Sequence, residues 1–278
     1  MSIDGVAPFV CSMLAAAHTP RGFDYKICRK SFLNKLGGRM QDSNQQIDPL
    51  QNHLLASLPR NEFAHFKASL KLVELSPGDI LVRPDTISQY VYFPVRGAVS
   101  LHYKLDHDMS ADIALVGREG VFSIVPILGG GAVPCFAEVE TAGFAYRLPA
   151  KALSNEIDES KSVRRVMLLF VQALFVQIAQ INVCARYRTL RELLCLHLVL
   201  LHDRMDGDSF AMTQQMFAHM LGVRRESISQ ISGELRRQRL IEYQRGQITI
   251  LDRAGLEAEC SVCYDTLRPH FSKLLKTV

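Results

Sequence analysis

The chain has 278 residues, of which 48% are hydrophobic and 22% are charged, and its formal net charge is +4. This composition excludes disordered, collagen-like and small disulfide-framework proteins, and it is typical of a soluble protein with one or two folded domains. The seven cysteines are scattered, which favours a reducing compartment with mostly free, buried thiols. No apolar run reaches the roughly 18 residues that a membrane span needs, so we expect no membrane association.

Residues 1–47 contain Gly, Arg, Lys and Ser without clear periodicity, and we interpret them as a disordered N-terminal extension. A native start at Met40 is the alternative. The short apolar stretch near residue 10 lacks the positively charged flank of a signal peptide, because Asp4 is the only charge before it. We therefore expect a cytoplasmic protein.

Residues 48–158 are predicted to form a β-rich domain. From residue 48, leucine and phenylalanine side chains recur at helical spacing around a break at Pro59, which predicts short helices. Between Val73 and Leu148, β-branched and aromatic runs alternate with turn sequences such as Pro-Gly and Arg-Gly. Several short strands at this spacing predict a small barrel or sandwich.

Residues 159–187 are predicted to form one long helix, about 40 Å in length at 1.5 Å per residue. Its apolar stripe is too wide for a single packing partner. One subset of apolar residues alternates in spacings of three and four, with Gln177 as the break, and we predict that it faces a second copy of the chain. This predicted dimer interface consists of Val163, Met167, Phe170, Leu174, Gln177 and Ile181. A core helix of a monomer is the alternative.

Residues 188–278 carry the signals of short helices followed by a hairpin. Thr213 is a suitable N-cap for one short helix, and Gly222 can adopt the positive φ that a tight turn demands. The next helix begins at Arg224 and places isoleucine and leucine side chains on one face. The segment that follows alternates around an Arg-Gly pair, like a small β-hairpin. Together these signals predict a winged helix-turn-helix.

Six arginines and three glutamates lie between Gln214 and Leu251, which gives this segment a local charge of +3. A solvated helix face explains the arginines at the end of the second helix. It does not explain why Arg225, Glu226 and Gln230 cluster near the helix start, opposite the apolar face. Residues at this position of a winged helix-turn-helix contact base edges, where Arg binds guanine, Gln binds adenine and Glu accepts from cytosine. The segment is therefore predicted to read double-stranded DNA.

The segment TQQMFAHMLGVRRESISQI resembles the helix-turn-helix pattern of the Crp/Fnr family of bacterial transcription regulators. The upstream segment PGDILVRPDTISQYVYFPVRGAVSL resembles the β-roll of that family, with Gly78 and Gly97 at its turn glycines. The resemblance covers roughly residues 50–265. It implies an α+β fold with an N-terminal β-roll (a jelly roll like that of cyclic-nucleotide-binding domains), a long dimerisation helix and a C-terminal winged helix-turn-helix.

The resemblance also assigns roles to single residues. Arg225 and Glu226 fall on the family's base-reading pair, and Gln230 stands where many members have a second base-reading Arg. Ser227 falls on the hydroxyl residue that contacts the DNA backbone, and Arg224 replaces a common Ser and adds a phosphate contact. The predicted base-reading residues are Arg225, Glu226 and Gln230. The predicted contacts with the DNA backbone are Thr213, Arg224, Ser227, Ser229, Arg236, Arg237 and Arg239.

The β-roll departs from the members of the family that bind cyclic nucleotides. Those members have a Gly-Glu pair for the ribose and an Arg-Ser pair for the phosphate, whereas Ser123-Ile124 and Pro134-Cys135-Phe136 stand at about these places. No Lys or Arg lies between Arg118 and Arg147, and a buried phosphate without a cation loses its strongest partner. We therefore expect no binding of cyclic AMP. An apolar effector pocket, or a vestigial one, would be lined by Val121, Phe122, Ser123, Ile124, Val133, Pro134, Cys135 and Phe136.

Other cofactors are also disfavoured. Cys11 and Cys28 are too few and too far apart for an iron–sulfur cluster, and the histidines near the β-roll are more often structural than haem ligands. The pair Cys260-Ser-Val-Cys263 has no second pair at zinc spacing, so we predict no metal site there.

These features predict a homodimeric, sequence-specific transcription regulator of the bacterial cytoplasm that binds pseudo-palindromic DNA with half-sites about 34 Å apart. An effector at the β-roll would act through the junction at Cys184–Thr189. An activator would also contact RNA polymerase, although no segment marks that surface. The alternative is an effector-binding or protein-interaction module with a degenerate helix-turn-helix. No nucleophile–base pair supports catalysis, so we predict no catalytic residue and no enzyme activity.

Overall fold

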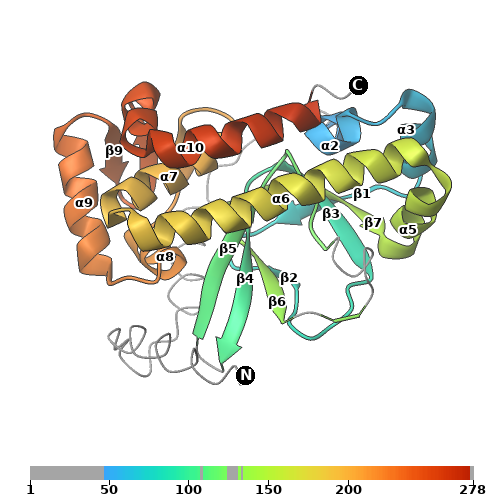
Figure 1. Ribbon diagram of the computed structural model, residues 1–278, viewed down its shortest axis with the longest axis horizontal. Coiled ribbons are helices and arrows are strands. Elements are labelled where there is room, and N and C mark those ends of the chain that lie inside the picture. Colours follow the sequence, from blue (N-terminus) through green and yellow to red (C-terminus); the bar gives the residue numbers. More distant parts are fainter. Residues whose placement is uncertain (1–46, 107–108, 124–130, 133, 276–278) are drawn as a thin grey trace, which may run out of the picture.

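The computed structural model describes residues 47–275 except for 107–108, 124–130 and 133. Almost all of the predicted extension at residues 1–47 therefore lies outside the described residues. Figure 1 shows a β-rich part and a helical part, with one long helix, α6, running along both. This order confirms the predicted α+β fold of β-roll, long helix and winged helix-turn-helix.

The β-roll domain begins with short helices and continues as two antiparallel sheets. The helices are η1 (Pro49–Gln51), α2 (His53–Ala56) and α3 (Arg60–Lys67), and Pro59 is the N-cap of α3. The strands are β1 (Lys71–Leu75), β2 (Ile80–Val82), β3 (Tyr90–Arg96), β4 (Val99–Asp106), β5 (Met109–Val116), β6 (Cys135–Val139) and β7 (Gly143–Pro149). One sheet has the order β1-β7-β3 and the other β2-β6-β4-β5. α5 (Ala150–Glu159) follows β7.

A tight turn and an apolar interior hold the two sheets in place. Gly97, between β3 and β4, has a φ of +88°, and a Cβ there would lie 2.9 Å from the carbonyl oxygen of Thr141. Glycine is therefore the residue that this turn accepts. Phe93 and Leu148 are buried between the sheets, in a core that also takes in Phe170 of α6. The long helix thus completes the core of the β-roll domain.

α6 (Lys161–Tyr187) starts at Ser160, whose hydroxyl oxygen accepts a hydrogen bond from the Val163 amide at 3.1 Å. The helix packs against β5, α5, α7 and α10 of its own chain. Because it contacts elements from both domains, it fixes where the β-roll ends and where the helical part begins.

The structure corrects the predicted dimer interface. The stripe chosen for it faces the interior of the chain: Val163, Met167, Phe170, Gln177 and Ile181 are buried, and Leu174 is half-buried. Gln177, expected to interrupt a seam between two helices, donates from Nε2 to the carbonyl oxygen of Leu115 in β5 at 3.0 Å. A regular apolar spacing identifies a buried face, but it does not identify what buries that face.

A second apolar stripe of α6 is exposed. It includes Leu168, Phe175, Val183 and Tyr187, whose exposed fractions are 54%, 71%, 52% and 78%. By length and composition alone α6 could cross a membrane. Gln172 and Gln177 interrupt its apolar run, so the sequence did not indicate this property. The burial of its opposite face against β strands identifies it as a helix of a folded domain with one uncovered side.

The helix-turn-helix domain follows directly after α6. Its elements are α7 (Leu190–His202), β8 (Ser209–Ala211), α8 (Gln214–Met220), α9 (Arg225–Arg237), β9 (Ile241–Gln244), β10 (Gln247–Ile250) and α10 (Arg253–Leu275). The three strands form a sheet in the order β8-β10-β9, in which β8 was not predicted. Arg245 and Gly246, between β9 and β10, have φ values of +52° and +79°, as a tight two-residue hairpin turn requires.

Ion pairs connect the β-roll domain to the loop after α7. Asp206 pairs with Arg118 at 3.1 Å and with Arg96 at 3.0 Å. Arg204 is buried and pairs with Glu119 at 2.6 Å, while its guanidinium also donates to the Leu115 carbonyl oxygen at 2.9 Å. These contacts define the relative placement of the two domains.

One pair of cysteines departs from the expected free thiols. A disulfide joins Cys184 near the end of α6 to Cys263 in α10, with the two Cα atoms 6.6 Å apart. Cys195 and Cys260 are free and buried, as the sequence predicted for most of the thiols. The sequence did not indicate the pairing, because 79 residues separate the two cysteines.

Candidate nucleic-acid interface

α8 and the turn after it set the position of α9. The Thr213 hydroxyl oxygen accepts a hydrogen bond from the Met216 amide at 3.1 Å, so Thr213 is the N-cap that the sequence predicted. Gly222 has a φ of +63°, and α9 begins three residues later, with Arg224 in extended conformation as its N-cap. This geometry places α9 at the outer end of the domain, as Figure 1 shows.

α9 has one buried face and one exposed face. Ile228, Ser232 and Leu235 are buried against the rest of the domain. All three predicted base-reading residues, Arg225, Glu226 and Gln230, are exposed in the first two turns of the helix. Of these, Gln230 has a long hydrogen bond from Nε2 to Oε1 of Glu234, at 3.4 Å. The structure thus brings a cation, a carboxylate and an amide to one solvent-facing surface.

Tyr243 of the hairpin holds the start of α8 close to this surface. Its hydroxyl oxygen accepts a hydrogen bond from the Gln214 amide at 2.9 Å. Burial raises the pKa of Tyr243, while the nearby positive charge of Arg225 acts in the opposite direction. Arg225 is therefore close to the hairpin as well as to solvent.

The residues predicted to contact the DNA backbone lie around the same surface. Arg224, Ser229, Arg236, Arg237 and Arg239 are exposed, and Thr213 and Ser227 are half-buried. Arg236 pairs with Glu242 of β9 at 3.3 Å, and the two side chains are 61% and 50% exposed. A pair of this kind is worth little in water, so it leaves Arg236 open to a phosphate.

Sequence reasoning missed Arg245 at the tip of the hairpin, which is also exposed. Its signal was the Arg-Gly pair, which was read only as a turn. By contrast, Arg191 of α7 pairs with Glu259 at 2.8 Å and with Glu234 at 3.5 Å. These pairs connect α7 to α9 and α10, so Arg191 stabilises the packing of the helices rather than contributing to the predicted DNA-binding surface.

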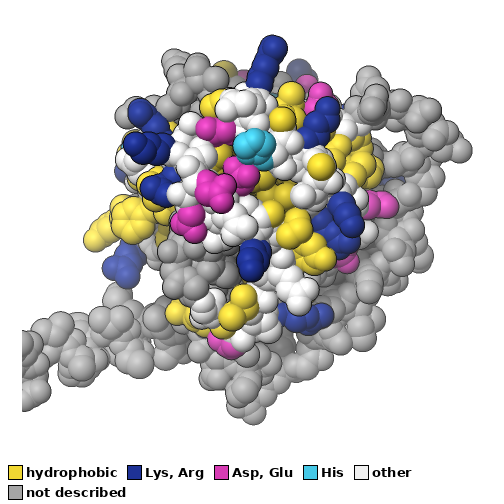
Figure 2. Space-filling view, turned by 90° about the vertical axis from the view of Figure 1, so that its right-hand side faces the viewer, with side chains coloured by type: hydrophobic (Ala, Val, Ile, Leu, Met, Phe, Trp, Pro, Cys, Tyr) yellow, Lys and Arg dark blue, Asp and Glu magenta, His cyan; other side chains and the backbone are white. Residues whose placement is uncertain are grey.

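The opposite end of the molecule also carries basic side chains. Figure 2 shows the end formed by α3 and α5, where acidic and basic side chains are mixed with hydrophobic ones. Here His65 and Glu156 face each other at 3.3 Å.

The residues predicted to line an effector pocket are divided between two environments. Val121 and Phe122 are buried in the core of the β-roll domain, and Ser123 follows them with a positive φ of +70°. Pro134, Cys135 and Phe136 are half-buried, and the Phe136 ring stacks on His102 with ring centres 4.6 Å apart. Ile124 and Val133 lie outside the described residues.

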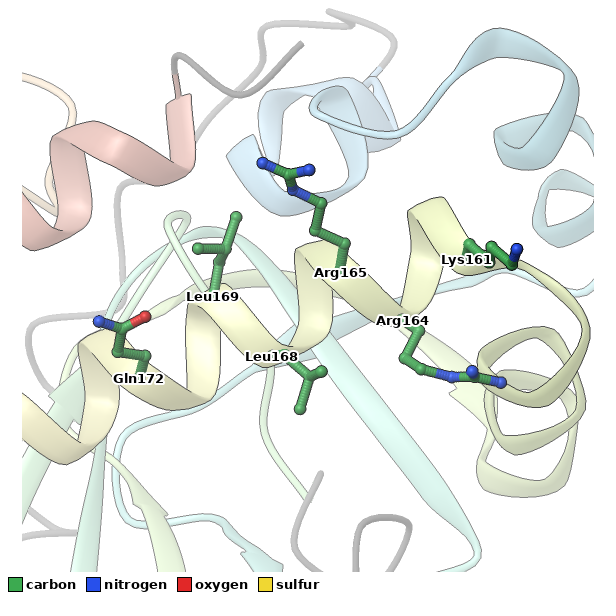
Figure 3. Close-up of a pocket in the computed structure, with 6 residues that line it drawn as sticks. All are labelled: Lys161, Arg164, Arg165, Leu168, Leu169 and Gln172. Carbon is green, nitrogen blue, oxygen red and sulfur yellow. The ribbon is translucent and has the colours of Figure 1, made fainter.

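Two hollows of the described surface lie elsewhere. A groove of about 270 Å³ runs along the first half of α6 and is lined by Lys161, Arg164, Arg165, Leu168, Leu169 and Gln172. Figure 3 shows Arg165 and Leu169 on the side towards α2 and α10, with Leu168 on the other side. A second hollow, of about 430 Å³, lies beside the pairs of Asp206 with Arg96 and Arg118.

Comparison with known families decides the identity of these domains. A model of the Crp-like helix-turn-helix domain matches residues 190–259, and a model of the cyclic nucleotide-binding domain matches residues 72–160. The two matches span more than half of the 278 residues, in the order of the fold. The chain belongs to the Crp/Fnr family. It is therefore a transcription regulator with a DNA-binding helix-turn-helix, and not an enzyme.

This Crp/Fnr protein is similar to several known proteins at low sequence identity. It is 23% identical over 220 residues to the global nitrogen regulator of Synechococcus elongatus, covering 76% of this chain and 98% of that protein. The crystal structure of a putative Crp/Fnr regulator from Eubacterium rectale has 17% identity and a TM-score of 0.58, covering 78% and 100% of the two chains. FixK2 from Bradyrhizobium japonicum has 18% identity and a TM-score of 0.59, covering 68% and 96%. These structures support the fold alone.

Proposed function

We propose that this Crp/Fnr protein acts as a homodimer that binds pseudo-palindromic double-stranded DNA and reads base edges with Arg225, Glu226 and Gln230. The proposal rests on α9, whose apolar face is buried while these three polar side chains are exposed near its start. A guanidinium can bind guanine O6 and N7, a carboxylate can accept from cytosine N4, and an amide can bind adenine. All three types of group therefore suit a major groove.

The surrounding cations are proposed to bind phosphates. Arg224 lies before the first turn of α9, Arg237 and Arg239 lie at its end, and Arg245 lies at the hairpin tip. Cations on both sides of a recognition helix can contact the two phosphate backbones that border the groove. Such contacts position the protein without specifying sequence, so they complement the base-reading residues.

The second copy is proposed to cover the exposed stripe of α6. Regulators of the Crp family act as dimers, and this stripe places Leu168, Phe175 and Val183 at intervals of seven and eight residues along one side. Such spacing keeps a stripe facing a parallel partner helix over two heptads. A twofold axis would place the same stripe on both copies and would set two recognition helices against two half-sites.

We extend the proposal to the ligand of the β-roll domain, which we infer is not a cyclic nucleotide. The domain matches the cyclic nucleotide-binding model, yet the sequence from Glu119 to Tyr146 contains no Lys or Arg. Any phosphate bound there would lack a charge-assisted partner from that segment. A match to the fold of a cyclic nucleotide-binding domain does not by itself mean that a cyclic nucleotide binds.

DNA binding can be tested by fluorescence anisotropy of the ligand-free protein on DNA from upstream of its own gene, with Arg225→Ala as the test variant. Arg60→Ala is the matched control, because Arg60 is an exposed arginine of α3 at the opposite end of the molecule. We expect tight binding that weakens steeply with salt, loss of specific binding in Arg225→Ala, and no effect of Arg60→Ala.

A different outcome would favour the alternative of a protein-interaction module. Binding that neither depends on salt nor differs between the two variants would contradict base reading by α9. Selection of bound sequences from random DNA would then show whether any sequence is preferred.

The dimer can be tested by sedimentation of Phe175→Glu, with Val262→Glu as control. Both residues are exposed apolar side chains, at 71% and 59%, but Val262 lies on α10 rather than on the proposed interface. We expect Phe175→Glu to sediment as a monomer and Val262→Glu to remain a dimer, because a carboxylate in an apolar interface would be desolvated. Dimers of both variants would place the interface elsewhere.

A further inference from the structure

The C-terminal helix α10 extends beyond the matched helix-turn-helix domain and connects both domains. The family match ends at residue 259, whereas α10 continues to Leu275. Its first half belongs to the helix-turn-helix core through Leu256 and Tyr264, and Phe271 in its second half packs against the β-roll core. Figure 1 shows α10 lying beside α6 along this course.

Polar contacts attach the first half of α10 firmly to α7. Arg253 pairs with Asp203 at 2.8 Å, and the Tyr264 hydroxyl donates to the same carboxylate at 3.0 Å. Arg253 also donates to the Val199 carbonyl oxygen at 3.1 Å. Residue 263 therefore moves with the helix-turn-helix domain. Cys184 is part of the long helix α6, and its side chain is buried in the same helix-turn-helix core as Cys263.

The disulfide between Cys184 and Cys263 ties the end of α6 to α10, beside the junction between α6 and α7. Cys184 lies three residues before the end of α6, and α7 starts at Leu190. Both cysteines are almost fully buried, at 2% and 3% exposure. A change in the angle between α6 and α7 would move Cys263 relative to Cys184, so the covalent bond opposes such a change.

We propose that Cys184 and Cys263 are an oxidation site, and that their disulfide fixes the helix-turn-helix domain on α6 whereas reduction lets it reorient. Only the effect on DNA rests on the function proposed above. Disulfides within the cytosol are uncommon, and those that form there are usually transient and redox-sensing. Because this disulfide ties α6 to α10, oxidation of the two thiols would affect where the helix-turn-helix domain places α9.

The reaction balances with a hydroperoxide as oxidant. One thiolate attacks a peroxide oxygen, so that an S–O bond forms, the O–O bond breaks and, with hydrogen peroxide, water leaves after protonation. The second thiol then attacks the sulfenic sulfur, which forms the S–S bond, breaks the S–O bond and releases a second water. The two thiols supply both electrons and the peroxide accepts them. Because both thiols are buried when bridged, the first step occurs while the junction is open.

Two neighbouring thiols provide internal controls. Cys195 in α7 and Cys260 in α10 are free and buried in the same core. Burial raises the pKa of each to about 12, so both stay protonated and unreactive at neutral pH. A response to oxidant that requires Cys184 and Cys263 but not Cys195 is therefore specific to the junction.

The test compares the full-length protein after reduction with dithiothreitol and after treatment with hydrogen peroxide. Non-reducing peptide mapping should find a linked peptide that contains Cys184 and Cys263. Amide hydrogen exchange in α10 should slow by roughly thirtyfold or more on oxidation, because the bridge disfavours the open chain. Cys184→Ala and Cys263→Ala should both exchange at the same rate under the two conditions, and Cys195→Ala should respond like the wild type.

Two results would overturn the proposed site: absence of the linked peptide, or equal slowing of exchange in Cys184→Ala. For the regulatory role, the DNA affinities of oxidised and reduced wild type should differ by about tenfold. Equal affinities with the bridge formed would refute that role. Failure of every form to bind DNA, with the bridge and the exchange response intact, would contradict the proposed DNA-binding function instead.

Discussion

Each of the two domains of this Crp/Fnr protein matches a family model, but the two domains differ in the charged residues that they present. The helix-turn-helix domain presents Arg225, Glu226 and Gln230 to solvent from a helix whose other face is buried. The β-roll domain keeps the two sheets and the turn glycine Gly97, yet it has no Lys or Arg from residue 119 to 146. A shared fold does not by itself mean that the same ligand binds, so the activity of each domain has to be inferred from the residues at its site.

The largest expected effect is a loss of stability where α6 packs against the β-roll domain. Phe170 is fully buried between α6 and the sheets, so Phe170→Ala should lower the free energy of unfolding by about 3–5 kcal/mol. Phe175→Ala, on the exposed side of the same helix, should change the stability of the single chain by less than about 0.5 kcal/mol. Urea unfolding of both variants, at a concentration where the chain is monomeric, measures the difference. Equal losses would mean that the two faces of α6 are not as distinct as their burial indicates.

A smaller effect is expected at the phosphate-facing cations of the helix-turn-helix domain. Arg239→Ala should weaken binding by a similar factor on all DNA sequences and should reduce the slope of log affinity against log salt by about one. Anisotropy titrations on a preferred and on a random duplex, at several salt concentrations, provide the measurement. A loss confined to the preferred duplex would make Arg239 a base-reading residue.

A modest dependence of stability on pH is expected in the helix-turn-helix domain. Burial lowers the pKa of His197 from its ordinary value of 6.5, with Arg204 acting in the same direction. Below about pH 6.5 the unfolded chain therefore binds a proton that the folded chain does not, and stability falls with decreasing pH. The contribution is fully present above the unfolded pKa. Urea unfolding at about pH 7.5 and about pH 5.5 should show a smaller difference for His197→Gln than for the wild type.

The last prediction is that cyclic AMP has no effect on the stability of the protein. Addition of cyclic AMP should leave the Tm unchanged, because a ligand stabilises a fold only if it binds the folded state. A Tm that rises with cyclic AMP concentration would show that the β-roll domain finds a phosphate partner outside residues 119–146, and it would remove the contrast between the domains.

The sequence predicted those parts of the molecule that depend on local signals. Thr213, Gly222 and the Arg-Gly turn each determine the conformation of a few neighbouring residues, so the helices and hairpin of the helix-turn-helix domain could be placed from the sequence. The exposed face of α9 followed from the spacing of its buried residues.

Features that depend on distant contacts could not be placed in this way. The spacing along α6 identified a buried stripe, but the β-roll and α10 cover it rather than a second copy. β8 has only three residues and exists because it pairs with β10, and Cys184 meets Cys263 only because α10 folds back along α6. Such contacts are decided by tertiary packing, which periodicity alone does not contain.

The most direct test of the central claim is selection of bound sequences from a random DNA pool by the wild type and by Arg225→Ala. We expect two related half-sites about one helical turn apart for the wild type, and loss of preference at one base pair in each half-site for the variant. An identical sequence profile for both proteins, or no enriched sequence for the wild type, would contradict base reading by α9.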